Sequence, residues 1–140
     1  MSLLILVVDD EPDVETLFRQ QFRRDIRDGR FTMDFAQSAD SALQLISDAA
    51  GASLILILSD INMPGMSGLE MLPHVKSISP NTVVVMISGM QTVESAIGAL
   101  RLGAFDYLMK PFDLRQVEAV VKRALEHREL IVAKQRYETQ

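Results

Sequence analysis

The sequence predicts an α/β fold, in which helices cover both faces of a doubly wound, five-stranded parallel sheet and the last helix is extended. Two observations carry this prediction. Residues 3–8, 54–58 and 82–87 are almost entirely apolar, and such short runs are typical of parallel strands that are buried on both faces. Segments with helical apolar spacing alternate with the strands, as expected for right-handed β-α-β crossovers.

The first half of the chain supplies two pairs of a strand and a helix. Strand 3–8 leads to a helix that begins near Pro12, a residue suited to the first turn, and that continues to the break at residues 28–29. A short strand with alternating polarity is predicted at 32–36. The next helix, over about 38–51, is expected to begin at a Ser or Asp cap and to stop at a glycine.

The second half supplies three more strands. The apolar run at the start of 54–60 ends in an acid and then in a Pro-Gly turn, and a helix over about 67–79 follows. Strand 82–87 closes on Ser-Gly and is followed by a helix over 93–103, which a glycine ends. A last short strand is predicted at 105–109. The chain therefore alternates five strands with five helices, and this alternation is the basis of the predicted fold class.

The last helix is longer than a single domain needs. It runs from Leu114 to Gln140, 27 residues, or roughly 40 Å if helical throughout. Its second half is mostly charged, with a thin apolar stripe of Leu130, Ala133 and Tyr137. Two interpretations stay open at this point: a solvated tail that frays, or a linker toward a coiled coil or an output domain.

Composition excludes several classes of protein. The chain has 140 residues, a net charge of −5 and no cysteine, so neither a disulfide framework nor a thiolate metal site is available. The acidic balance argues against direct binding of nucleic acid. No run approaches eighteen apolar residues and no secretory signal is visible. We therefore expect one cytoplasmic domain with no membrane segment.

One edge of the predicted sheet collects polar residues, because every parallel strand presents its carboxyl end there. The residues are Asp9 and Asp10, Asp60, Ser88 and Lys110. Any one of them alone is better explained by a cap or a turn. Together, three carboxylates would repel one another unless they hold a cation, and ligands that are all oxygen favour Mg²⁺. Carboxylate, Mg²⁺, lysine and hydroxyl are the groups needed for phosphoryl transfer to an aspartate.

Four motifs resemble the signature set of the response-regulator receiver (CheY-like) family: residues 7–11 (VVDDE), 59–65 (SDINMPG), 87–89 (ISG) and 103–112 (GAFDYLMKPF). They occur in the family's order and spacing, and the resemblance extends over about residues 3–123. It implies the flavodoxin-like receiver fold. It also implies a signalling domain of two-component systems that catalyses only its own phosphorylation and dephosphorylation.

The resemblance implies a role for each acid of the site. Asp60 matches the residue that accepts a phosphoryl group from a phosphohistidine. Asp10 and Asp60 match side-chain ligands of Mg²⁺, and the backbone carbonyl of Asn62 matches a third ligand. Asp9 matches an acid that holds the ion chiefly through water. Asn62 and Met90 would flank the path of attacking water and influence how long the phosphoryl group persists.

The remaining roles belong to a switch. Lys110 matches the lysine that pairs with the phosphoryl group, and its bond to Pro111 is expected to be cis, as in the family. Ser88 matches the hydroxyl that turns toward a phosphoryl oxygen, where threonine is commoner. Tyr107 matches the aromatic residue that moves inward to fill the space the hydroxyl leaves.

The resemblance also implies partners. The phosphoryl donor is expected to be a sensor histidine kinase or a phosphotransfer protein, and residues 1–123 are expected to form the receiver domain. Residues 124–140 would extend the last helix toward an output domain beyond Gln140. The kinase, the output and a phosphorylation-dependent homodimer are left open.

Two other functions share part of this pattern. A phosphatase of the haloacid dehalogenase type also uses an Asp at a strand end with Mg²⁺, but it needs a second acid two residues later, where this chain has Asn62. A nucleotide- or flavin-binding domain needs a glycine-rich phosphate loop after the first strand. Residues 9–13 (DDEPD) have the opposite electrostatic character, so the sequence argues against this function.

Overall fold

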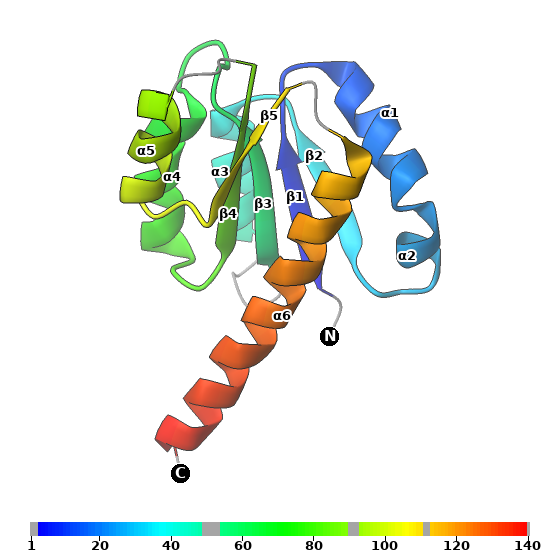
Figure 1. Ribbon diagram of the computed structural model, residues 1–140, viewed down its shortest axis with the longest axis vertical. Helices are drawn as coiled ribbons and strands as arrows, with labels where there is room; N and C mark the ends of the chain where they lie inside the picture. The colour runs from blue at the N-terminus through cyan, green and yellow to red at the C-terminus, as the bar shows by residue number, and fades with distance from the viewer. Residues whose placement is uncertain (1–2, 49–53, 90–92, 111–112, 140) are drawn as a thin grey trace.

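The computed structural model describes residues 3–48, 54–89, 93–110 and 113–139. Its strands form one all-parallel sheet with the order β2-β1-β3-β4-β5 (Figure 1). The strands are β1 (Leu4–Val8), β2 (Thr32–Ala36), β3 (Leu54–Asp60), β4 (Val83–Ser88) and β5 (Asp106–Met109). This order and direction confirm the predicted doubly wound sheet.

The helices follow the strands in the predicted alternation, with one addition. They are α1 (Pro12–Gln21), α2 (Arg23–Arg27), α3 (Ala39–Asp48), α4 (Gly68–Ile78), α5 (Val93–Arg101) and α6 (Leu114–Thr139). The single helix expected from Pro12 to the break at residues 28–29 is divided at Phe22, whose backbone has φ −103° and ψ 19°. Phe22 is buried edge-on against the rings of Phe18 and Phe31, so aromatic packing accompanies the division.

Two apolar layers hold the helices to the sheet. On one face, α1 and α6 pack through Val14 and Phe18 and through Val117 and Val121. On the other face, α3, α4 and α5 pack through buried residues that include Met71. All seven residues of β3 are buried, as predicted for a central strand covered on both sides. Figure 1 shows α6 crossing one face, with α3, α4 and α5 on the opposite face.

The register of the sheet decides which residues reach its carboxyl edge. Val8 pairs with Ser59, Asp60 pairs with Ile87, and Ser88 pairs with Met109. The strand order reverses between β1 and β3, and ligands of doubly wound sheets bind at such a switch point. Asp9 and Asp10 follow β1 and Asp60 ends β3, so the acids lie at this point.

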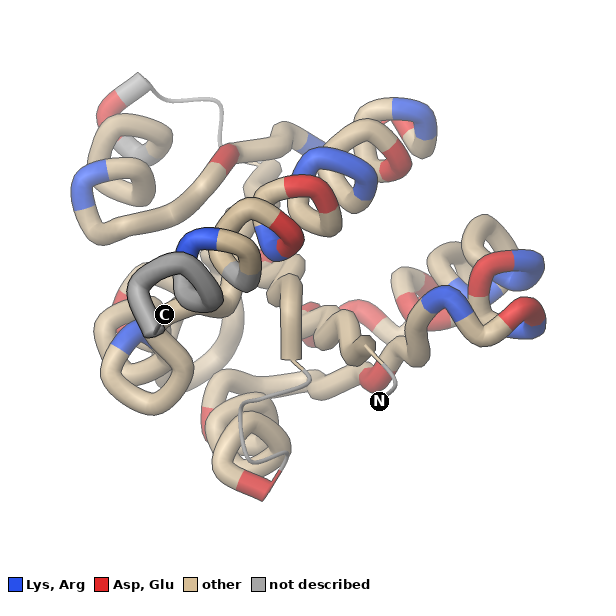
Figure 2. The backbone as a smooth tube through the Cα atoms, turned by 90° about the horizontal axis from the view of Figure 1, so that it is seen from below, with Lys and Arg blue, Asp and Glu red and all other residues tan. Residues whose placement is uncertain are grey.

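Helix α6 is the extended helix that the sequence predicts. It has 26 residues, or about 39 Å at the usual rise. Among the side chains that the structure describes, Ala124 is the last buried one in α6, and Leu130 is 69% exposed. The last turns project beyond the sheet (Figure 1), and Figure 2 shows basic and acidic residues along the helix.

Within the described residues, no helix combines the length and the apolar character needed to cross a membrane.

Candidate functional site

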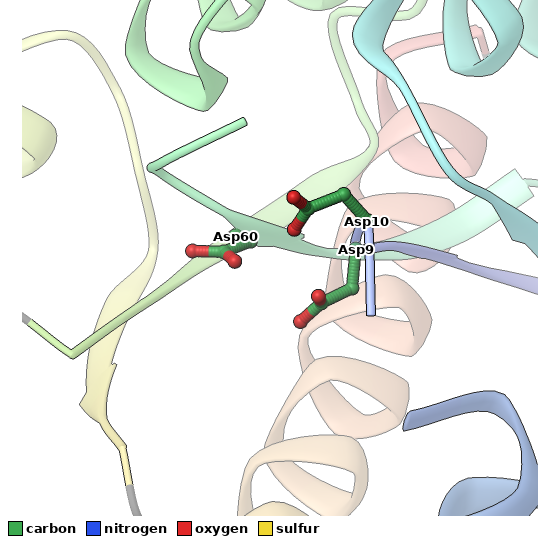
Figure 3. Close-up of side chains that lie close together, drawn as sticks. All are labelled: Asp9, Asp10 and Asp60. Carbon is green, nitrogen blue, oxygen red and sulfur yellow. The ribbon is translucent and has the colours of Figure 1, made fainter. Parts of the chain in front are cut away.

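Three carboxylates converge at the carboxyl edge of the sheet. One side-chain oxygen each from Asp9, Asp10 and Asp60 lies within 4.8 Å of the other two, and Figure 3 shows these side chains near one another at the ends of their strands. Asp9 and Asp60 are only 6% and 5% exposed, whereas Asp10 is exposed to solvent. The cluster is therefore buried on one side and open to solvent on the other.

Asp9 is held by the backbone that follows β1. Its N–H donates to the carbonyl of Ala36 at 3.0 Å, which continues the pairing with β2 by one residue. Its Oδ1 accepts from the N–H of Glu11 at 2.9 Å, an arrangement typical of Asp in a turn. Helix α1 then begins at Pro12. The two hydrogen bonds thus hold Asp9 between the end of β1 and the start of α1.

Asp60 ends β3, a strand whose seven residues are all buried. The N–H of the next residue, Ile61, donates to the carbonyl of Ile87 at 2.9 Å. Asp60 Oδ1 accepts from the N–H of Asn62 at 3.2 Å, and the Asp60 carbonyl accepts from Ser59 Oγ at 3.1 Å. The Asn62 N–H thus orients the Asp60 carboxylate, and the other two bonds hold the backbone on either side of it.

Lys110 brings a positive charge to the two buried acids. Its Nζ lies 2.9 Å from Asp9 Oδ2 and 3.1 Å from Asp60 Oδ2, with Glu11 Oε1 at 3.5 Å. Its backbone N–H donates to the carbonyl of Ser88 at 2.7 Å, so β4 positions Lys110. Burial alone would lower the pKa of Lys110, but the hydrogen bonds and charges of Asp9 and Asp60 outweigh it and raise that pKa. The ammonium therefore stays charged at neutral pH.

Burial shifts the pKa of Asp60 in the direction opposite to its effect on Lys110. It raises the pKa of the Asp60 carboxyl above its ordinary value, against the hydrogen bond and the charge of Lys110, which lower it. The charge of Asp9 adds to the rise. Among the described residues, three carboxylates therefore share the single nearby ammonium of Lys110, and the cluster keeps an excess of negative charge.

Ser88 lies on β4, which pairs with the acceptor strand β3, and Tyr107 lies on β5, on the far side of β4. Ser88 ends β4 and is 1% exposed. The Asn62 side-chain amide donates to Ser88 Oγ at 3.4 Å, so Asn62 links the β3 and β4 ends. Tyr107 on β5 is half-buried against the cluster under α3, α4 and α5. Met90 and Pro111 lie outside the described residues.

Glu11 and Gly68 lie at the site but were not among the residues predicted for it. Glu11 approaches Lys110 across the edge of the sheet, and its place in the first motif was a signal that could have identified it. Gly68 begins α4 against the backbone of Asp60. The sequence around Gly68 carries no sign of this contact, because it depends on how the helix returns to the strand.

The chain is similar to known proteins in sequence. The protein-family model of the response regulator receiver domain matches residues 5–122 of this chain. The regulatory protein AtoC of Escherichia coli (strain K12) is 37% identical over 122 residues, which cover 87% of this chain and 25% of AtoC. The chain thus spans about a quarter of the length of the curated relatives it matches first.

Solved structures agree with the sequence matches. The crystal structure of adenylate cyclase from Rhodopirellula baltica superimposes with a TM-score of 0.88 at 26% identity, and the match covers 100% of this chain and 99% of that chain. The solution structure of the beryllofluoride-activated NtrC4 receiver domain dimer gives 0.79 at 27% identity, over 89% of this chain and 98% of that chain. The chain therefore belongs to the response-regulator receiver family of two-component signalling systems.

Proposed function

We propose that Asp60 accepts a phosphoryl group from a phosphohistidine on a sensor histidine kinase or a phosphotransfer protein, in a reaction that depends on Mg²⁺. The observation that supports this most is the convergence of three carboxylates with the Lys110 ammonium, 3.1 Å from Asp60, on the edge of the sheet where ligands bind. Asn62 stands where a phosphatase of the haloacid dehalogenase type needs its second acid, which disfavours that alternative.

The donor set fits Mg²⁺. Three carboxylate oxygens within 4.8 Å of one another are the hard ligands that this ion prefers, and ligands on one Mg²⁺ lie up to roughly 4 Å apart. We propose that Asp10, Asp60 and the backbone carbonyl of Asn62 would bind the ion, with Asp9 holding it chiefly through water. When bound, the ion supplies positive charge to the transferring phosphoryl group.

The reaction itself needs little covalent chemistry from the protein. A carboxylate oxygen of Asp60 attacks phosphorus, an O–P bond forms as the P–N bond to the donor imidazole breaks, and the imidazole takes a proton from solvent. Lys110 would transfer its ion pair from Asp60 to a phosphoryl oxygen, since its ammonium already lies 3.1 Å from the acceptor. Water later attacks the acyl phosphate, which restores Asp60 and releases inorganic phosphate. Positioning and charge account for the rate.

The phosphorylated state would then be read through β5 and α6. We propose that Ser88 turns toward the phosphoryl group and Tyr107 moves inward. Asp106 accepts from the N–H of Tyr107 at 2.7 Å and forms an ion pair with Arg123 of α6. A movement of Tyr107 would therefore be transmitted directly to α6.

The proposed path from β5 to α6 suggests that the chain consists of a receiver domain and a linker. Residues 1–123 would be the receiver unit, and 124–140 a linker helix toward an output domain beyond Gln140. A homodimer that forms on phosphorylation is compatible with the exposed Leu130 on that helix. We also propose a cytoplasmic location, where a histidine kinase would meet its ATP.

Acetyl phosphate with Mg²⁺ tests the acceptor. One acid-labile phosphoryl group per chain is expected by intact mass, and Asp60→Asn should abolish it because the amide is not a nucleophile. The exposed Asp40 on α3 offers a matched control, and Asp40→Asn should be labelled like the wild type. Labelling that persists in Asp60→Asn would refute the assignment of the acceptor.

A further inference from the structure

Gly68, the first residue of α4, lies against the backbone of the acceptor strand. A Cβ atom built at Gly68 would lie 2.3 Å from the Asp60 carbonyl oxygen, 3.1 Å from the Asp60 carbonyl carbon and 3.1 Å from Ile61 Cα. All three atoms belong to the backbone, so no side-chain rotation relieves the contact. Gly68 is therefore a place where the absence of a side chain lets a helix approach the phosphorylation site.

Neither partner of this contact is free to move. On one side, β3 is the central strand with all seven residues buried, and Ile61 is tied to Ile87 by a 2.9 Å hydrogen bond. On the other side, the Gly68 N–H donates to the Ile61 carbonyl at 2.9 Å. Ser67 and Glu70 close a reciprocal capping box around the same helix start. The start of α4 is thus joined to the end of β3 by a short, closed loop.

We propose that Gly68 is a positioning residue for phosphorylation. Because it has no side chain, α4 can begin in contact with the end of β3, and this contact keeps loop 61–67 and the Asp60 carboxylate in the positions that the reaction needs. This inference rests on the proposed function. Asn62, whose carbonyl is the proposed metal ligand, lies in that loop, and its N–H also donates to Asp60 Oδ1. A displaced helix start would therefore disturb both the acceptor and the ion.

The size of the disturbance follows from the contact distance. An ordinary contact for a Cβ begins at 3.4 Å, so alanine at position 68 requires the helix start and the strand end to separate by about 1 Å. Ile61 and Met63 anchor the loop in the core, whereas Asn62 between them is exposed, so a displacement would fall on Asn62 more readily than on the core. A misplacement of this size costs up to about 10²-fold in rate. We expect Gly68→Ala to lose about 10- to 100-fold in phosphorylation rate, with weaker Mg²⁺ binding.

The experiment compares Gly68→Ala with two controls in the full 140-residue chain. Gly98 lies in the middle of α5, where an added Cβ meets nothing within 4 Å, so Gly98→Ala is a matched change in a helix without the contact. Val75→Ala removes buried apolar surface from α4 and is a control for lost stability alone. Each protein is assayed for acetyl phosphate labelling, for the Kd of Mg²⁺ by calorimetry, and for the folded fraction by circular dichroism.

The predicted pattern separates position from stability. Per folded molecule, Gly98→Ala and Val75→Ala should be phosphorylated at the wild-type rate and bind Mg²⁺ with the wild-type Kd. Gly68→Ala should be phosphorylated more slowly and bind Mg²⁺ more weakly. If Gly68→Ala is partly unfolded, the assays are repeated in sucrose, which favours the folded state. A Gly68→Ala protein that labels and binds Mg²⁺ like the wild type per folded molecule overturns the inference. Failure of the wild type to label at all would instead count against the proposed function.

Discussion

Replacement of Lys110 by alanine should reveal how much the site depends on its positive charge. The Lys110 side chain is 19% exposed and contacts Asp9 and Asp60, whose side chains are 4% and 6% exposed. Without the ammonium, two buried carboxylates face each other uncompensated. Breaking a buried pair in this way typically costs 3–5 kcal/mol. Because the edge of the sheet is open to water at Asp10, we expect the lower end, about 3 kcal/mol of unfolding free energy.

Urea unfolding at pH 7, with and without Mg²⁺, measures this loss. A bound cation stabilises the folded state by mass action, about 2.7 kcal/mol at a hundredfold excess over Kd. The gain should be larger in Lys110→Ala, because Mg²⁺ then takes over the charge that Lys110 supplied. The difference in unfolding free energy between Lys110→Ala and the wild type should therefore become smaller when Mg²⁺ is added.

The exposed lysine Lys122 on α6 supplies the control, and Lys122→Ala should change the unfolding free energy by less than about 0.5 kcal/mol. A Lys110→Ala protein whose stability matches this control would show that the ion pairs contribute nothing. A loss that Mg²⁺ leaves unchanged would refute the idea that the same carboxylates bind the ion.

Three further predictions concern the metal and the switch. Asp10→Ala should weaken Mg²⁺ binding at least about 10-fold, as measured by calorimetry, and an unchanged affinity would remove Asp10 from the ligand set. Ser88→Ala should still be phosphorylated, but the change in hydrogen exchange of β5 and α6 on phosphorylation should shrink, because the hydroxyl that turns inward is gone; a full response would count against the switch. Arg123→Ala should be labelled at the wild-type rate yet lose the response of α6, since its ion pair with Asp106 joins the helix to β5. An α6 response equal to that of wild type would place the transmission elsewhere.

Several features of the fold could be predicted from local patterns. The apolar run of β3 followed by Asp60 is enough to indicate a buried central strand with an acid at its end, because a strand covered on both faces tolerates almost only apolar residues. The acids that follow β1 and the lysine that follows β5 were placed on the same edge by the direction of parallel strands alone. The alternation of strands and helices then determined the doubly wound fold.

Other features depended on packing between segments far apart in the chain. The division between α1 and α2 at Phe22 accompanies the burial of its ring against Phe31, and helical periodicity does not report such a contact. The position of Glu11 near the Lys110 ammonium arises between residues 99 positions apart.

The sequence by itself determined which groups meet at the carboxyl edge of the sheet: Asp9, Asp10, Asp60, Ser88 and Lys110. The common direction of parallel strands is sufficient for that, since each group directly follows or ends a strand. Only the tertiary structure decided that Lys110 bridges two buried acids and that α4 begins in contact with the Asp60 carbonyl. Both depend on distances of a few ångströms between separate elements, and such distances are set when all the layers pack together.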